Sequence, residues 1–361
     1  MKICHVIGTL QVGGAEKQYI NQINALSELG HDIHAIVLSR ITEKALLDSI
    51  NKNIQIYYLP VKLIKLPFVV VRLMRYFKCH KIEVVHTHMF WASLYAALAA
   101  RLSGMKVLVT TEHGMNPWKK KWHYWAERFL ISSKAYKRIC VSKDILENRI
   151  QRDQLPVEQM LVLPNGVTVN EYSSRHWNFD APIRLIAVGR LIEAKDYGVL
   201  FEAIHLLPQY PLKLSVLGEG KLYDELQALI HTLNLSDKIS LCGNQADPVN
   251  WLYKSHVFVM SSKREGQPMA LLEAMSTGIP IVSTNVGGIK DTLNDRSSLL
   301  VEAGDAVVLA AAIEKMILDV ELANQLGHQA FSDLVNQYAI NSVTNKLLDI
   351  YQNGLADYEK K

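Results

Sequence analysis

The feature that most limits the fold of this chain is a short pattern between residues 257 and 280, an uncharged segment followed by a turn and a helix. Val257–Ser262 carries no charge and has the length of a short buried strand. Pro268 suits the first turn of a helix, because its missing N–H group is not needed there. Gly278 and Pro280 then predict where that helix ends. The stretch therefore predicts a strand–turn–helix unit.

The beginning of the chain follows the same order of elements. Lys2–Ile7 is an apolar run that predicts a first buried strand, and a helix pattern follows from Glu16 to Leu29. His34–Leu38 reads as the next strand. This β–α–β opening favours a doubly wound parallel sheet, in which ligands bind beyond the carboxyl ends of the strands.

Two carboxylates belong to the helix pattern, eight positions apart. Glu265 lies on the loop before the helix, and Glu273 lies more than one turn inside it. The N–H groups of Met269, Ala270 and Leu271, at the positive end of the helix dipole, predict an anion site between them. A ligand with both phosphate and hydroxyl groups, such as a nucleotide sugar, would use all of these features. The alternative is an ordinary capped helix with two acids that face solvent.

The residue pattern of this stretch is long and specific. Glu-Gly-x-Pro, four residues, and then Glu-Ala-Met-x-x-Gly-x-Pro resembles the Glu-x7-Glu signature of retaining glycosyltransferase family 4, and the likeness continues through Ile281–Gly288. The resemblance spans nearly the whole chain, up to about residue 335. It implies the GT-B architecture, an α/β fold of two facing Rossmann-like domains with parallel sheets and an active site in the interdomain cleft. It also implies transfer with retention, in which an oxygen of the sugar donor's phosphate takes the acceptor's proton.

The resemblance implies further site residues. Gly-Arg-Leu at 189–191, followed by Lys195, is similar to the family segment whose Arg and Lys bind the diphosphate, although Asp196 stands in place of a glycine. Thr-Glu-His-Gly at 111–114 is similar to the segment whose histidine approaches the transferred sugar. Glu265 would hold the sugar's hydroxyls, and Glu273 those of the ribose. The catalytic residues expected are His113, Glu265, Arg190 and Lys195, and the residues expected to bind the sugar donor are Gly14, Arg190, Lys195, Gly218, Asn244, Glu265, Met269, Ala270, Leu271 and Glu273.

The glycine loop after the first strand excludes two common nucleotide sites. Gly8 and Gly13 have the spacing of a P-loop, but Gly14 stands where the lysine should be. The loop also lacks the Gly-x-Gly-x-x-Gly pattern of dinucleotide-binding proteins. In the family that the chain resembles, Gly-Gly-Ala-Glu comes close to the donor phosphate and the acceptor. Gly14 is therefore expected near the ligands, while an ATPase and a Rossmann NAD site are rejected.

No metal or other cofactor is expected. Asp-x-Asp, which grips a metal–diphosphate in the other major glycosyltransferase architecture, does not occur in the sequence. Arg190, Lys195 and the helix start would stabilise the leaving diphosphate in place of a metal. His86 and His88, two positions apart, would allow a metal, but no acid or cysteine lies near them in sequence. We expect them to be polar residues at a strand end that line the cleft.

The length of 361 residues predicts two domains. We expect an acceptor-binding domain at 1–170, a linker at 171–182, a nucleotide-sugar-binding domain at 183–335 and a helix at 336–361 that packs back on the first domain. The longest uncharged run of the N-terminal half has 17 residues and contains two histidines, which is a poor membrane span. The chain starts without a signal-peptide pattern, and its 4 cysteines are scattered, so a cytoplasmic location is expected.

Charge is segregated along the chain. Residues 1–175 carry 24 Lys and Arg against 13 Asp and Glu, whereas the rest carries 15 against 22. The N-terminal half should therefore meet an anionic partner, and the basic–aromatic segment Trp118–Trp125 suits a phospholipid surface. Lys62–Lys78 predicts either a second membrane contact or a plain surface helix. We expect peripheral attachment to the inner face of the membrane and no nucleic-acid partner, because no recognition motif is present.

The sequence thus predicts a retaining, metal-independent glycosyltransferase. It would move a sugar, most simply from a UDP-sugar, to a glycan or polyprenyl-diphosphate-linked acceptor in the synthesis of cell-surface polysaccharide. Two alternatives stay open at this point. A GT-B sugar-nucleotide epimerase would turn over its substrate without an acceptor, and a non-catalytic scaffold would bind the nucleotide sugar without any transfer.

Overall fold

The computed structural model describes the chain except for residues 41, 62–65, 115–117, 154, 170–181 and 361. It divides into an N-terminal unit, Met1–Gly166 with Ile340–Lys361, and a C-terminal unit, Val167–Ala339. The expected segments were 1–170, 171–182, 183–335 and 336–361; in the structure the second unit begins at Val167 and the chain returns to the N-terminal unit at Ile340. The expected linker lies almost entirely outside the described residues.

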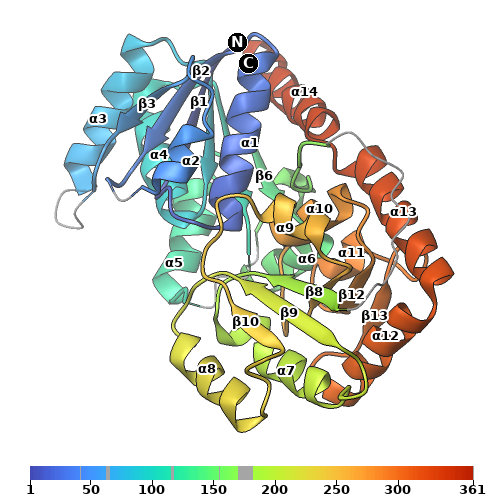
Figure 1. The fold of residues 1–361 in the computed structure, drawn as a ribbon. Coiled ribbons are helices and arrows are strands. Elements are labelled where there is room, and N and C mark those ends of the chain that lie inside the picture. The colour runs from blue at the N-terminus through green and yellow to red at the C-terminus, as the bar shows by residue number, and fades with distance from the viewer. Residues whose placement is uncertain (41, 62–65, 115–117, 154, 170–181, 361) are drawn as a thin grey trace. The chain divides into compact units, whose positions relative to one another are not determined.

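The N-terminal unit is built on a seven-stranded sheet in the order β3-β2-β1-β4-β5-β6-β7, with every pairing parallel (Figure 1). Its central strands are buried almost throughout because both faces are covered, as is usual for parallel sheets. The strands are β1 (Lys2–Ile7), β2 (Asp32–Val37), β3 (Gln55–Tyr58), β4 (Val84–His88), β5 (Val107–Glu112), β6 (Lys137–Cys140) and β7 (Met160–Val162).

Successive side chains of β1 enter two different cores. Cys4 and Val6 pack with α3 (Leu66–Cys79) and α4 (Phe90–Ser103). Ile3 and Ile7 pack on the other face with α1 (Gly14–Glu28), α2 (Lys44–Asp48) and α14 (Ile340–Glu359). The remaining helical segments are α5 (Lys121–Ala126), the π-helix η2 (Glu127–Ile131), α6 (Lys143–Asp153) and the short η3 (Val157–Gln159).

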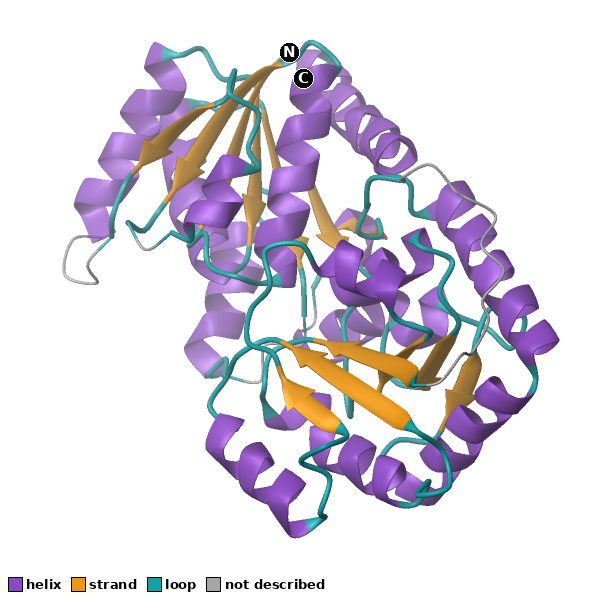
Figure 2. Cartoon of the chain, in the orientation of Figure 1, coloured by secondary structure: helices purple, strands orange, loops and turns teal. Residues whose placement is uncertain are grey.

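The C-terminal unit is built on a second sheet that is flanked by helices (Figure 2). This sheet has six strands in the order β10-β9-β8-β11-β12-β13, again with every pairing parallel. The strand order reverses between β8 and β11, which is the switch point where ligands of such sheets bind. The strands are β8 (Ile183–Val188), β9 (Leu212–Leu217), β10 (Ile239–Leu241), β11 (Val257–Met260), β12 (Ile281–Thr284) and β13 (Leu299–Val301).

Helices cover both faces of this second sheet. One core joins the sheet to α7 (Tyr197–His205), α8 (Tyr223–Thr232) and α12 (Ala306–Leu318). The other core joins it to α9 (Pro248–Lys254), α10 (Met269–Ser276), α11 (Ile289–Thr292) and α13 (Val320–Gln337). A 3-10 turn, η4 (Glu193–Lys195), follows β8. None of the described helices is long and apolar enough to cross a membrane.

The expected strand–turn–helix unit is present as β11 and α10, with one correction at the start of the helix. Pro268 was expected inside the first turn, but it is the N-cap, with an extended backbone, and Met269 is the first helical residue. Gly278 takes a positive φ of 65° just beyond the C-cap Thr277, which is the usual role of a glycine there. The parallel α/β class was therefore correctly predicted, and the helix begins one residue later than expected.

Candidate active site

Two of the predicted residues meet at the switch point of the C-terminal unit. Lys195 follows β8 on the turn η4, and Glu265 follows β11. Their side chains form an ion pair, with 2.6 Å between Lys195 Nζ and Glu265 Oε1, and only 15% and 12% of them are exposed. The two residues are 70 positions apart in sequence, so the fold alone brings them together.

Neighbouring loops hold Glu265 in place. Ser262 Oγ donates a hydrogen bond to Glu265 Oε1 over 2.7 Å, and the amide of Gly288 donates to the Glu265 carbonyl over 3.2 Å. Gly287 has a φ of 49°, and a Cβ atom there would lie 2.1 Å from the Glu265 carbonyl oxygen. Only glycine fits this approach, so the loop after β12 fixes the loop that carries the carboxylate.

The ends of β8 and β9 also approach closely. Gly218 has a φ of 140°, and a Cβ atom there would lie 2.1 Å from the carbonyl oxygen of Gly189. The amide of Gly218 donates to the carbonyl of Gly243 over 2.8 Å, which places the predicted Asn244 directly beyond this contact. The structure thus shows that Gly218 is needed for the packing of these turns, and contact with a nucleoside stays a prediction.

The departure from the family pattern at Asp196 has a structural explanation. Asp196 adopts a left-handed backbone with a φ of 50°, a conformation that glycine adopts freely and that aspartate tolerates better than most residues. Its carboxylate also forms an ion pair with Lys263 over 3.0 Å. The aspartate in place of the family's glycine therefore keeps the turn that positions Lys195. Arg190, the second residue after β8, is exposed.

The start of α10 presents backbone amides, as predicted, but not all three of them are available. The amide of Leu271 donates to the carbonyl of Pro268 over 3.1 Å. The amides of Met269 and Ala270, the first two residues of the helix, have no carbonyl partner within it and are therefore left as donors. Glu273 lies one turn further on and is half-buried.

In the N-terminal unit, Gly14 is the first residue of α1 and Gly13 is its N-cap. The carboxylate of Glu16 folds back over this helix start: Thr9 Oγ1 donates to Glu16 Oε1 over 3.2 Å, and a Cβ atom on Gly13 would lie 2.4 Å from Glu16 Oε2. A negative group at this end of a helix is favourable. The glycine loop therefore lies against an acid that the chain itself supplies.

His113 follows β5, and its Nε2 atom lies 3.1 Å from Nδ1 of His88. Burial lowers the pKa of His113 to about 4, and the neighbouring Glu112 carboxylate opposes that shift. His113 is therefore a neutral imidazole at physiological pH.

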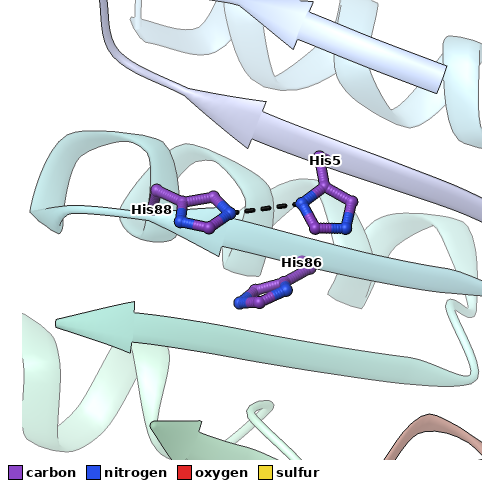
Figure 3. A group of neighbouring side chains, drawn as sticks. All are labelled: His5, His86 and His88. Atoms are coloured by element: carbon purple, nitrogen blue, oxygen red, sulfur yellow. Dashed lines mark hydrogen bonds between the residues drawn. The ribbon is translucent and has the colours of Figure 1, made fainter. Parts of the chain in front are cut away.

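His86 and His88 were expected to line a cleft, and this prediction was wrong. Both are 0% exposed, as is His5 on β1, and the three rings gather on one face of the sheet (Figure 3). They form the one group of potential metal ligands in the described parts of the chain, with ligand atoms within 4.8 Å of one another. Every ring nitrogen of the three already has a hydrogen-bond partner, so a metal would have to displace these bonds.

The segment Trp118–Trp125 also differs from expectation. Lys119 was expected at the surface, but its side chain is 0% exposed and pairs with Glu127 at 2.6 Å and Glu112 at 3.5 Å. Arg149 reaches the same two carboxylates, at 2.6 Å and 3.1 Å. Although burial raises the pKa of Glu112, Arg149, Lys119 and Arg138 hold it down at about 2. This buried ion cluster fixes the end of β5, directly before His113.

Aromatic side chains remain exposed on the same segment. Trp118, Trp122 and Trp125 are 48%, 46% and 56% exposed, and Lys120 and Lys121 beside them are exposed as well. These five residues are the aromatic–basic patch.

Open α/β sheets bind ligands at their switch point, and a helix start with free amides favours anions. Residues 170–333 match the family described as Glycosyl transferases group 1, and residues 12–171 match the one described as Glycosyltransferase Family 4. The two matches together cover most of the chain. The protein is a glycosyltransferase with a Glycosyltransferase Family 4 domain followed by a Glycosyl transferases group 1 domain.

Relatives and solved structures agree with this assignment. The chain is 26% identical to UDP-Gal:alpha-D-GlcNAc-diphosphoundecaprenol alpha-1,3-galactosyltransferase of Escherichia coli, over 97% of this chain and 96% of the relative. It is 27% identical to N-acetylgalactosamine-N,N'-diacetylbacillosaminyl-diphospho-undecaprenol 4-alpha-N-acetylgalactosaminyltransferase of Campylobacter jejuni, over 90% and 92%. HepE of Anabaena, solved in complex with UDP, superposes with a TM-score of 0.83 at 17% identity, covering 98% of this chain and 100% of that one. The predicted GT-B fold is confirmed.

Proposed function

We propose that the protein transfers a sugar from a UDP-sugar to a glycan carried on polyprenyl diphosphate, in the synthesis of cell-surface polysaccharide. The pair Lys195–Glu265 at the switch point carries this proposal, because it sets a cation and a hydroxyl-binding carboxylate side by side. The two bacterial relatives support the acceptor class, since both are named for undecaprenol diphosphate-linked acceptors.

Each group at the site has a task in this reaction. Lys195 and Arg190 bind the diphosphate, and the amides of Met269 and Ala270 add neutral donors to its oxygens. Glu265 accepts hydrogen bonds from hydroxyls of the transferred sugar. Its ion pair with Lys195 holds the carboxylate in place before the ligand arrives.

Transfer proceeds with retention and without a metal. The acceptor hydroxyl forms a bond to the anomeric carbon on the face from which the diphosphate leaves, the bond from that carbon to the phosphate oxygen breaks, and the acceptor's proton passes to a phosphate oxygen. The products are a glycoside and UDP. Lys195 and Arg190 stabilise the charge that develops on the diphosphate, which is the task a metal performs in other transferases.

The protein attaches peripherally to the inner face of the membrane through its N-terminal unit. The aromatic–basic patch supplies exposed tryptophans, which favour the interface, and exposed lysines, which favour anionic lipid. Phe68 on α3 is 51% exposed and carries Arg72 over its ring at 4.4 Å, which gives a second contact of the same character. Lys119 takes no part, because its charge is buried.

The test is a transfer assay with a panel of nucleotide sugars, each with and without polyprenyl-diphosphate-linked acceptors. We expect UDP release only when acceptor is present, no change with saturating EDTA, and an anomeric configuration of the product that matches the sugar donor. Conversion of a UDP-sugar without acceptor would establish an epimerase instead. Binding of UDP with no turnover of any sugar would establish a scaffold.

A further inference from the structure

A continuous chain of hydrogen bonds runs through the interior of the N-terminal unit and ends at His113. It joins three strands to the C-terminal helix α14, so residues that are distant in sequence take part in it. We call this chain the relay. Its links are Thr111 Oγ1 to His86 Nε2 at 2.7 Å, His86 Nδ1 to Tyr351 OH at 2.6 Å, Tyr351 OH to His5 Nε2 at 3.4 Å, His5 Nδ1 to His88 Nε2 at 3.2 Å and His88 Nδ1 to His113 Nε2 at 3.1 Å.

The members of the relay are neutral. His5, His86, His88 and Tyr351 are each 0% exposed. Burial lowers the pKa of the histidines, that of His5 to about 3, and raises the pKa of the tyrosine well above its ordinary value. A charge anywhere along this path would carry the full cost of desolvation.

Neutrality restricts the protons to two arrangements. A neutral imidazole has one N–H group and one lone pair, and a hydroxyl donates one hydrogen. If every link is a hydrogen bond, each member must donate toward the same end of the relay. Either all four histidines carry their proton on Nδ1 and donation runs from Thr111 toward His113, or all four carry it on Nε2 and donation runs the other way.

Thr111 selects between the two arrangements. When donation runs toward His113, the Thr111 hydroxyl gives its hydrogen to His86 Nε2. In the reverse arrangement that hydrogen has no acceptor, because His86 Nε2 is the partner of Thr111 Oγ1 within the described part of the chain. Thr111 is only 2% exposed, so bulk solvent does not reach its hydroxyl. A buried donor without an acceptor is costly, which favours the Nδ1–H arrangement.

We propose that the relay fixes His113 as the neutral Nδ1–H tautomer and so makes it a hydrogen-bond donor to an oxygen atom of the bound substrate. Nδ1 of His113 is buried and has no hydrogen-bond partner among the described residues, which leaves it for a ligand. His5, His86, His88 and Tyr351 are positioning residues that act through His113. The donor role rests on the proposed glycosyl transfer, whereas the tautomer does not.

The tautomers can be read directly from the full-length protein without substrate. Labelling with 15N-histidine and recording long-range 1H–15N correlations distinguishes protonated from unprotonated ring nitrogens. Loss of signals in His113→Gln, and in the matching single variants, assigns each ring. We expect Nδ1–H at His5, His86, His88 and His113. A wild-type His113 with its proton on Nε2 overturns the proposal.

Tyr351→Phe breaks the relay in its middle, and Tyr19→Phe is its matched control. Tyr19 is also 0% exposed and lies edge-on to His5 and His88, but its hydroxyl has no hydrogen-bond partner among the described residues. In Tyr351→Phe, Thr111 no longer biases His113, so its Nδ1–H fraction should fall toward a mixture. In Tyr19→Phe that fraction should stay at the wild-type value.

Activity then links the tautomer to catalysis. If His113 acts only as the Nδ1–H form, kcat/KM in Tyr351→Phe must fall by the same factor as the measured Nδ1–H fraction. A fall in activity with an unchanged tautomer, or a changed tautomer with unchanged activity, overturns the donor role. A wild type that shows the four Nδ1–H signals but transfers no sugar refutes the proposed function and leaves the relay standing.

A second pair of variants covers the case in which Tyr351→Phe folds poorly. Thr111→Val removes the hydroxyl that sets the direction of donation, and Thr111→Ser keeps it. We expect Thr111→Val to shift His113 toward a mixture and Thr111→Ser to restore the Nδ1–H form. Equal tautomer fractions in the two variants would contradict the selection by Thr111.

Discussion

Buried histidines should make the N-terminal unit sensitive to mild acid. Burial lowers the pKa of His5 from 6.5 to about 3 and that of His113 to about 4. As the pH falls, the unfolded chain therefore binds protons before the folded one does. The contribution of these histidines to the free energy of unfolding is present at pH values above about 6.5, where they are neutral in both states. It is lost as the pH falls from there toward their pKa values in the folded protein.

The size of this loss follows from the two values. At pH 5, about 1.5 units below the ordinary pKa, each of these histidines favours the unfolded chain by about 2 kcal/mol, since one unit corresponds to about 1.4 kcal/mol. His5 and His113 together give a loss of about 4 kcal/mol. His86 and His88 shift in the same direction and add to it. Such a loss is a large share of the free energy of unfolding of a typical protein, which is roughly 5–15 kcal/mol.

Urea unfolding at several pH values between 7.5 and 5, followed by fluorescence of the tryptophans in the N-terminal unit, measures this loss. His5→Asn removes one titrating group and should reduce the loss between pH 7.5 and 5 by about 2 kcal/mol. His205→Asn, at an exposed position on α7, is the control and should not change it. A free energy of unfolding that stays constant over this range, or an equal pH dependence in His5→Asn, would refute the reasoning.

Three further predictions concern the sugar donor and the membrane. Glu273→Gln should weaken binding of UDP itself, whereas Glu265→Gln should leave UDP binding unchanged and weaken binding of a UDP-sugar. Calorimetry with both ligands measures these affinities, and an exchange of the two effects would mean that the roles are reversed. Lys195→Ala should lower kcat/KM by a factor that corresponds to a loss of about 2–4 kcal/mol in transition-state stabilisation, and wild-type turnover would show that Lys195 does not belong to the active site. Lys120→Ala with Lys121→Ala should weaken co-sedimentation with anionic liposomes by about 2 kcal/mol, more clearly at low than at high salt, and unchanged binding would exclude the patch.

The C-terminal unit was predictable from sequence because its features are local. The uncharged strand, the turn residues and the two glutamates of the α10 stretch lie within a few residues of one another. The ion pair of Lys195 with Glu265 joins two such stretches, and both strand ends could be placed by the rule for parallel sheets. Ser262 was missed as a partner of Glu265, although its position at the end of the predicted strand was a usable signal.

The N-terminal unit was less predictable because its polar groups depend on contacts between distant segments. Tyr351 is 265 positions from His86, and nothing in the local pattern of α14 marks it as a hydrogen-bond partner. Lys119 looks no different in sequence from Lys120, yet it is the one that enters the buried cluster with Glu127. The alternation of β1 places His5 on the same face as Ile3 and Ile7, and this was the one signal of its burial.

The two units place polar groups at the same topological position and solve the problem of burial differently. In the C-terminal unit the groups stand on loops beyond β8 and β11, where Lys195 and Glu265 form a partly exposed ion pair. In the N-terminal unit, His5 and His88 stand on β1 and β4 themselves, at the other switch point, where no water reaches them. Charges at that position would require partners as extensive as those of the buried ion cluster, whereas neutral rings need only one donor and one acceptor each. The switch point of this unit therefore carries neutral hydrogen-bonding rings, whereas the switch point of the C-terminal unit carries an ion pair.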